Sequence, residues 1–156
     1  MRSGSHEATV PAGVQWDAAE KAFSFSAGGS TITVDLTTNP NAMDQVSYEA
    51  WFKLPSSPSN LAWILSQSPD YGWSRAVTVN DKRLGYTGIT PGTWDSGLGR
   101  PSVNEWHHVV GVWDQGGTRT TYLDGVKGKD KARTSNGKGS NTAEKFNIGG
   151  VTCCHV

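Results

Sequence analysis

The sequence has few cysteines, no long apolar run and no excess of charge of either sign. The 156 residues include two cysteines, Cys153 and Cys154, which are adjacent. Their Cα atoms are about 3.8 Å apart, closer than in an ordinary disulfide, so a vicinal bridge, two free thiols and pairing with another chain stay open. No apolar run approaches the roughly 20 residues of a membrane span, which predicts no membrane insertion. Basic and acidic side chains number 14 each, and this balance argues against nucleic acid as a partner.

The sequence also lacks the motifs of several enzyme classes. Glycoside hydrolases on β-sandwiches place their paired carboxylates roughly 5 Å apart on one strand, in patterns such as Glu-x-Asp-x-x-Glu. Glu49 and Glu105 have no acidic neighbour at two or four residues. No HExxH, paired CxxC or phosphate-binding glycine loop occurs. We therefore predict a protein without catalytic residues, and keep a hydrolase with an atypical acid pair, Glu49 first among the suspects, as the second alternative.

Glycine and tryptophan are the abundant residues, at 19 and seven copies. Glycine-rich turns between short aromatic and β-branched runs are typical of all-β folds. The sequence therefore predicts a two-sheet antiparallel β-sandwich. We expect residues 1–12 to be a flexible N-terminus or a cloning scar, and residues 13–156 to form a single domain.

Alternation of apolar and polar residues marks the expected strands. In residues 45–55, Val46, Tyr48, Ala50 and Phe52 alternate with polar residues and Trp51, which predicts one buried and one outward face. A hairpin is expected over residues 21–36, with its turn at Gly28-Gly29, and a second one turning at Asp124-Gly125. Residues 61–68, 71–80 and 82–87 predict a meander. The Gly- and Pro-rich residues 88–104 predict a long loop at the rim of a site.

Two adjacent histidines, His107 and His108, stand in the run "NEWHHVVGVWD". Consecutive side chains of a strand point to opposite faces, so these imidazoles cannot chelate one ion. We interpret them as hydrogen-bonded packing residues of a strand that is central in its sheet.

Four stretches, taken in order, resemble a known superfamily: "SYEAWFKLP", "AWILSQS…YGWSRAVTVNDKRLGYT", "NEWHHVVGVWDQGGTRTTYLDGV" and "FNIGG". Together they resemble the laminin-G-like, concanavalin A-like proteins, which include the pentraxins. The resemblance implies a jelly roll whose concave face or rim loops bind sugars, glycans or proteins, often with calcium and usually outside the cell.

The end of the chain departs from that pattern. The resemblance implies a further strand after "NIGG", beside the first hairpin, whereas this chain ends in "VTCCHV". We expect that the domain lacks this last strand, or that "VQWDA" or a second copy of the chain fills its place. An unfilled place leaves open strand edges, through which the protein would form a homo-oligomer.

Aromatic residues near turns are the candidate ligand-binding residues, because an exposed indole can stack on a sugar ring while polar neighbours bind its hydroxyls. The alternative is that Trp73 and Trp94 close the ends of the sandwich, and that Trp51, Trp106 and Trp113 are packing residues. The face shared by Glu49 and Trp51 is a second candidate groove. The full set of candidates is Tyr71, Trp73, Arg83, Trp94, Asp95, Arg100, Glu49 and Trp51.

Calcium is the one cofactor for which the sequence offers candidate ligands. Asp81, Asp95 and Asp124 could supply carboxylates, although each is also an ordinary turn residue. We expect a non-catalytic recognition module for carbohydrate or glycoprotein, with a structural or protein–protein interaction module as the alternative.

Overall fold

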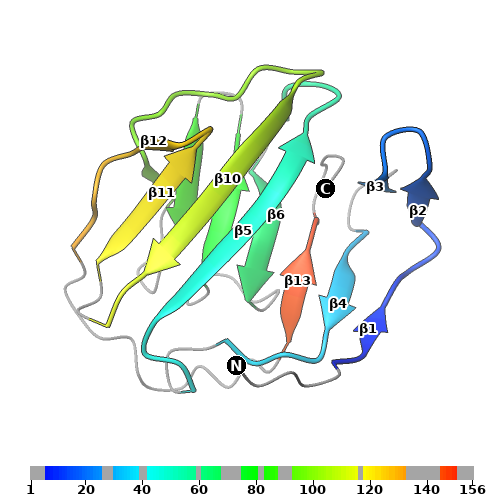
Figure 1. Ribbon diagram of the computed structural model, residues 1–156, viewed down its shortest axis with the longest axis horizontal. Helices are drawn as coiled ribbons and strands as arrows, with labels where there is room; N and C mark the ends of the chain where they lie inside the picture. The colour runs from blue at the N-terminus through cyan, green and yellow to red at the C-terminus, as the bar shows by residue number, and fades with distance from the viewer. Residues whose placement is uncertain are drawn as a thin grey trace.

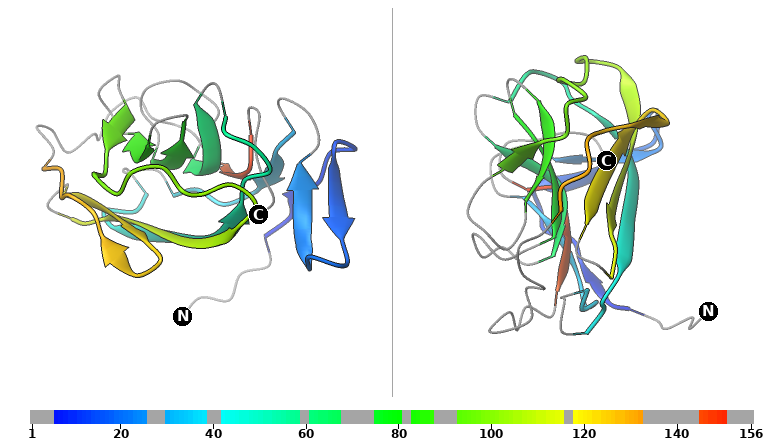
Figure 2. Two further views of the ribbon diagram at one scale, coloured as in Figure 1. Left: turned by 90° about the horizontal axis from the view of Figure 1, so that it is seen from above. Right: turned by 90° about the vertical axis from the view of Figure 1, so that its left-hand side faces the viewer.

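The computed structural model describes residues 6–25, 30–38, 42–58, 61–67, 75–80, 83–87, 93–115, 118–132 and 145–150. Every regular element in these residues is a β-strand, and two large sheets lie face to face (Figure 1, Figure 2). The predicted all-β sandwich is confirmed. In this part of the chain no helix is long and apolar enough to cross a membrane.

The larger sheet has seven strands and is antiparallel throughout. Its last four strands in sheet order follow one another in the sequence, which confirms the predicted meander. The strand order is β1 (Ala8–Thr9), β4 (Ile32–Val34), β13 (Phe146–Ile148), β6 (Ala62–Gln67), β7 (Ala76–Val79), β8 (Leu84–Thr87) and β9 (Thr93–Asp95).

The second sheet has four strands, in the order β12 (Val126–Lys127), β11 (Arg119–Leu123), β10 (Trp106–Trp113) and β5 (Val46–Lys53). Asp124 and Gly125 join β11 to β12 with φ values of 50° and 81°. Positive φ at both central residues is the signature of a type I′ hairpin turn, so the hairpin predicted from Asp-Gly is confirmed.

The core lies between these two sheets. Phe52, Ile64, Val77, Leu84 and Val109 are fully buried there. In β5 the buried and half-buried side chains alternate with the outward ones as the sequence predicts, because side chains of successive strand residues point to opposite faces.

The hairpin expected over residues 21–36 is wrong. The strand β3 (Ala22–Phe25) pairs instead with β2 (Val14–Asp17) in a separate two-stranded sheet, while β4 pairs with β1 and β13. Phe25 and Ile32 still meet, since both are buried in a small cluster with Val14. Side-chain packing, and not a shared ladder, therefore brings these neighbouring strands together.

Two further strands lie in segments for which the sequence predicts none. The sequence predicts a flexible N-terminus or a cloning scar over residues 1–12, and within this stretch Ala8–Thr9 form β1 and pair with β4. The sequence predicts a loop over residues 88–104, but Thr93–Asp95 form β9 because β8 offers them a ladder partner. "VQWDA" supplies β2, whose partner is β3.

Candidate functional site

The outward face of β5 carries an exposed tryptophan. Trp51 is 61% exposed, whereas Trp113 is 5% exposed and packs on Tyr48 in the core. The packing role offered for Trp51 is therefore wrong, and the one for Trp113 is confirmed. The cause is the strand alternation itself: the register that buries Tyr48 and Phe52 turns Trp51 outward.

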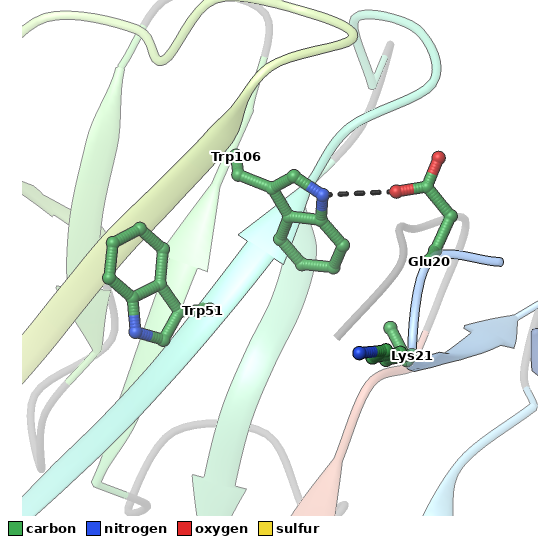
Figure 3. Close-up of a pocket in the computed structure, with 5 residues that line it drawn as sticks. Glu20, Lys21, Trp51 and Trp106 are labelled. Carbon is green, nitrogen blue, oxygen red and sulfur yellow. Dashed lines mark hydrogen bonds between the residues drawn. The ribbon is translucent and has the colours of Figure 1, made fainter. Parts of the chain in front are cut away.

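Trp51 and Trp106 line one side of a cleft, and the turn between β2 and β3 lines the other with Glu20, Lys21 and Ala22 (Figure 3). The cavity measures about 390 Å³. This volume falls within the roughly 300–1,000 Å³ of small-molecule sites. The cleft therefore combines an aromatic wall from the four-stranded sheet with a charged turn.

Glu20 fastens the turn to the four-stranded sheet. Its Oε1 accepts a hydrogen bond from Lys53 Nζ, and its Oε2 accepts one of 3.0 Å from Trp106 Nε1 (Figure 3). These two bonds, the one from Lys53 first, lower the pKa of Glu20. The Lys53 ammonium also lies 5.4 Å from the centroid of the Trp106 ring. Both charges of the pair are compensated, and the Trp106 indole is held in place before any ligand arrives.

A histidine holds the second indole. His108 is the cross-strand partner of Trp51, and their ring centroids are 5.1 Å apart with the planes tilted by 38°. His108 Nε2 lies 2.9 Å from Glu49 Oε1. One side of the Trp51 ring therefore rests on His108, and the remaining exposed surface is available to a ligand.

The two histidines lie on opposite faces, as predicted. His107 is 8% exposed and points toward the sandwich interior, while His108 is on the outward face. His107 Nδ1 lies 2.7 Å from Asp124 Oδ2, and its Nε2 lies 2.9 Å from Ser102 Oγ. The expectation of a hydrogen-bonded packing residue is confirmed for His107.

The order Ser102, His107, Asp124 is also the order of groups in a serine hydrolase. The Ser102 hydroxyl, however, donates a hydrogen bond to the carboxylate of Glu105. A hydroxyl has one hydrogen, so Ser102 cannot also donate it to His107 Nε2, as a nucleophilic serine must. We interpret the network as structural: it ties the segment before β10 to the turn between β11 and β12.

A family model described as the concanavalin A-like lectin/glucanases superfamily, of the laminin G type, matches residues 5–152. The chain belongs to this superfamily. No curated protein sequence matches it.

Solved structures share the superfamily fold with this chain. One is of botulinum neurotoxin type C, whose cell entry depends on interaction with two ganglioside molecules (14% identity, 95% of this chain, 39% of that chain, TM-score 0.67). Another is the binding domain of botulinum neurotoxin DC in complex with rat synaptotagmin II (18% identity, 94% of this chain, 39% of that chain, TM-score 0.67). A third is a carbohydrate esterase of Shiga toxin-encoding bacteriophage phi24B (16% identity, 96% of this chain, 85% of that chain, TM-score 0.55).

The toxin structures are much longer than this chain, which spans about two fifths of their length. At these identities the likeness shows the shared fold. The chain is therefore a jelly roll of a superfamily in which binding domains are well represented.

The rim candidates stand apart from the cleft or outside the described residues. Tyr71 and Trp73 lie outside the described part of the chain, and of Trp94 only the backbone, in β9, is described. Arg83, Asp95 and Arg100 are described, and they are not among the residues that line the cleft. Their role in binding stays a prediction.

Calcium also stays a prediction. The described residues contain no group of three His, Cys, Asp or Glu side chains that could hold a metal ion. Asp95 accepts a bond of 2.8 Å from the Gly97 N–H, and Asp124 accepts bonds from the side chain of His107 and the backbone N–H of His108. Asp81 lies outside the described residues.

Of the five residues that line this cleft, sequence reasoning proposed only Trp51 for binding. It did not name Glu20, Lys21 or Ala22, and it assigned Trp106 to packing. The bond between Glu20 and Trp106 joins residues 86 positions apart. No spacing or motif signals such a contact, which arises only once the hairpin and the sheet are packed together.

Proposed function

We propose that this chain is a non-catalytic recognition module that binds carbohydrate through the cleft between Trp51, Trp106 and the β2–β3 turn. The observation that carries the proposal is the 61% exposed ring of Trp51 on a cavity wall. Removing a large aromatic surface from water is favourable, and a sugar ring offers a flat apolar face that matches it.

The contacts around the indoles favour a ligand that needs little rearrangement. Trp106 is held by Glu20, and Trp51 rests on His108. A rigid aromatic surface loses less conformational entropy on binding than a mobile one. Glu49 is exposed and lies on the same face of β5 as Trp51, where its carboxylate can accept hydrogen bonds from sugar hydroxyls.

The fold relatives support a binding role of this kind. Cell entry of botulinum neurotoxin type C depends on interaction with two ganglioside molecules, and the binding domain of botulinum neurotoxin DC binds rat synaptotagmin II. We propose by analogy that the partner of this chain is a carbohydrate or glycoprotein and that the chain works outside the cell.

A glycan array tests the proposal, with the Trp51→Ala variant beside the wild type. We expect specific sugar binding by the wild type and its loss in Trp51→Ala, because the variant removes the stacking surface. Trp16→Ala is the matched control, since Trp16 is 57% exposed and does not line the cleft. Each indole packs on one neighbouring ring, Trp51 on His108 and Trp16 on Phe23, so both variants should lower the free energy of unfolding by a similar amount, about 1 kcal/mol. Equal loss of binding in both variants would refute the cleft as the site.

Repeating the array with a calcium chelator tests the calcium prediction. Binding that disappears with the chelator and returns with calcium supports a cation site in the loops. Binding that is unchanged places the recognition in the aromatic cleft alone.

A protein-interaction module is the second candidate function. The eight-residue strand β5 is at the edge of the four-stranded sheet, and edge strands can pair with another chain. Blank arrays together with a sedimentation coefficient that rises with protein concentration would favour this function and the expected homo-oligomer. Turnover of any glycan that is lost in Glu49→Gln would instead establish a hydrolase.

A further inference from the structure

Lys21 places a positive charge at the hairpin end of the cleft. Lys21 has a φ of 54° in the turn between β2 and β3, and its side chain extends to the side on which Trp51 lies (Figure 3). The residue is exposed and lines the cavity. Among the described carboxylates, none forms an ion pair with Lys21.

The nearby acidic groups are engaged elsewhere. Glu20 is compensated by Lys53 and the Trp106 indole, and Asp17 accepts N–H bonds from the backbone of Ala19 and Glu20. Glu49, which does not line the cleft, forms a 2.9 Å hydrogen bond with His108.

Glu49 lies far along β5 from the turn that carries Lys21. It precedes Lys53, the residue that anchors this turn, by four positions. At about 3.3 Å per residue this separation is roughly 13 Å. Charges this far apart in solvent are largely screened at physiological ionic strength, where the Debye length is about 8 Å. The ammonium group of Lys21 therefore lies next to the aromatic wall without an ion-pair partner among the described carboxylates.

We propose that the cleft selects sugars that bear a carboxylate, such as sialic or uronic acids, with the ring against Trp51 and the acid group at Lys21. This inference rests on the function proposed above and adds the chemical class of its ligand. A neutral sugar would stack on the same indole without using the charge. An acidic sugar would stack on Trp51 and also pair its carboxylate with Lys21.

The test is an array on which each neutral glycan is printed beside the same glycan carrying a terminal sialic or uronic acid. We expect the wild type to bind the acidic member of a pair more tightly by roughly two- to five-fold, the range of an exposed ion pair. Lys21→Gln should bind both members of a pair equally. Lys129→Gln is the matched control, because Lys129 is exposed, forms no ion pair with a described carboxylate and does not line the cleft, so the preference should remain.

The outcomes separate this inference from the proposed function. A wild type that binds neutral and acidic members equally, or a preference that survives in Lys21→Gln, overturns the inference and leaves sugar binding intact. Failure to bind any pair overturns both. Raising the salt concentration should weaken the preference of the wild type, since screening acts on the charge and not on the stacking.

Discussion

At the scale of single residues, Asp124 holds more of the structure than its place in a turn suggests. Its carboxylate accepts bonds of 2.7 Å from His107 and 2.8 Å from the backbone N–H of His108. Partial burial alone would raise the pKa of Asp124, but the bonds from His107 and His108 together outweigh it and lower the pKa. The charged form is therefore the one that the fold stabilises.

The Asp124→Asn variant should reveal this in its pH dependence. Asparagine tolerates the positive φ of the turn, so the variant removes the charge and leaves the backbone in place. Because the pKa of Asp124 is lower in the folded state than in the unfolded chain, its stabilisation is complete above the unfolded value. It is lost as the pH falls through the folded value. We expect the variant to lose about 1 kcal/mol at neutral pH, after allowance for exposure, and the difference to shrink below about pH 4.

Urea denaturation at a series of pH values measures this difference. Glu7→Gln is the control, because it neutralises an exposed carboxylate that directly precedes β1. A gap between wild type and Asp124→Asn that stays constant down to strongly acidic pH would contradict the assignment.

The sequence predicted the direction of a side chain correctly where a single strand determines it. The alternation in β5 placed Glu49 and Trp51 on the outward face, and the alternation in β10 separated His107 from His108. It could not place Lys21, because that side chain meets the cleft only through the packing of a separate hairpin.

At the scale of elements, β10 packs closely on the opposite sheet. A Cβ added to Gly111 would lie 2.8 Å from Trp113 Cη2 and 2.8 Å from Val77 Cγ2 of β7. Both neighbours belong to the buried core and have little room to move. The glycine thus lets the two sheets approach, although it lies in the middle of a strand.

Gly111→Ala should therefore destabilise the fold by about 1–3 kcal/mol, the usual range for overpacking. The double variant with Val77→Ala should lose less than the sum of the two single variants, because the second change removes one of the two clashing groups. Ser47→Ala, on the outward face of β5, is the control and should be nearly neutral. Urea denaturation compares the wild type with Gly111→Ala, Val77→Ala, their double variant and Ser47→Ala. Strictly additive losses would refute a direct clash.

The Asp-Gly turn signal predicted its hairpin correctly, whereas the Gly28-Gly29 signal did not, because distant partners determine the pairing there. Asp124-Gly125 specifies the β11–β12 hairpin locally. The pairing of β3 with β2, and of β4 with β13, depends on which strands share a buried cluster with Phe25 and Ile32. That choice is made by tertiary packing.

At the scale of the whole molecule, β13 joins two halves of the larger sheet. It pairs with β4 on one side and with β6 on the other. Its Asn147 is buried, and the Asn147 Oδ1 accepts a 3.2 Å hydrogen bond from Thr33 Oγ1. Without this strand, β1 and β4 have no ladder to the β6–β9 meander.

A chain that stops after residue 144 should consequently fail to unfold cooperatively. We expect a broad, shallow urea transition, because the edges of β4 and β6 are left unpaired and the core between the sheets is opened. A chain that stops after residue 150 keeps β13 and serves as the control. A single sharp transition in the shorter chain would show that β13 is dispensable.

The position of β13 also bears on how the protein is made. A ribosome delivers β4 and β6 long before residues 146–148, so the nascent chain carries two unpaired strand edges until β13 has been synthesised. Edges of this kind are where growing polypeptides aggregate. The yield of soluble protein should thus depend on chaperones that shield the emerging chain until β13 leaves the ribosome.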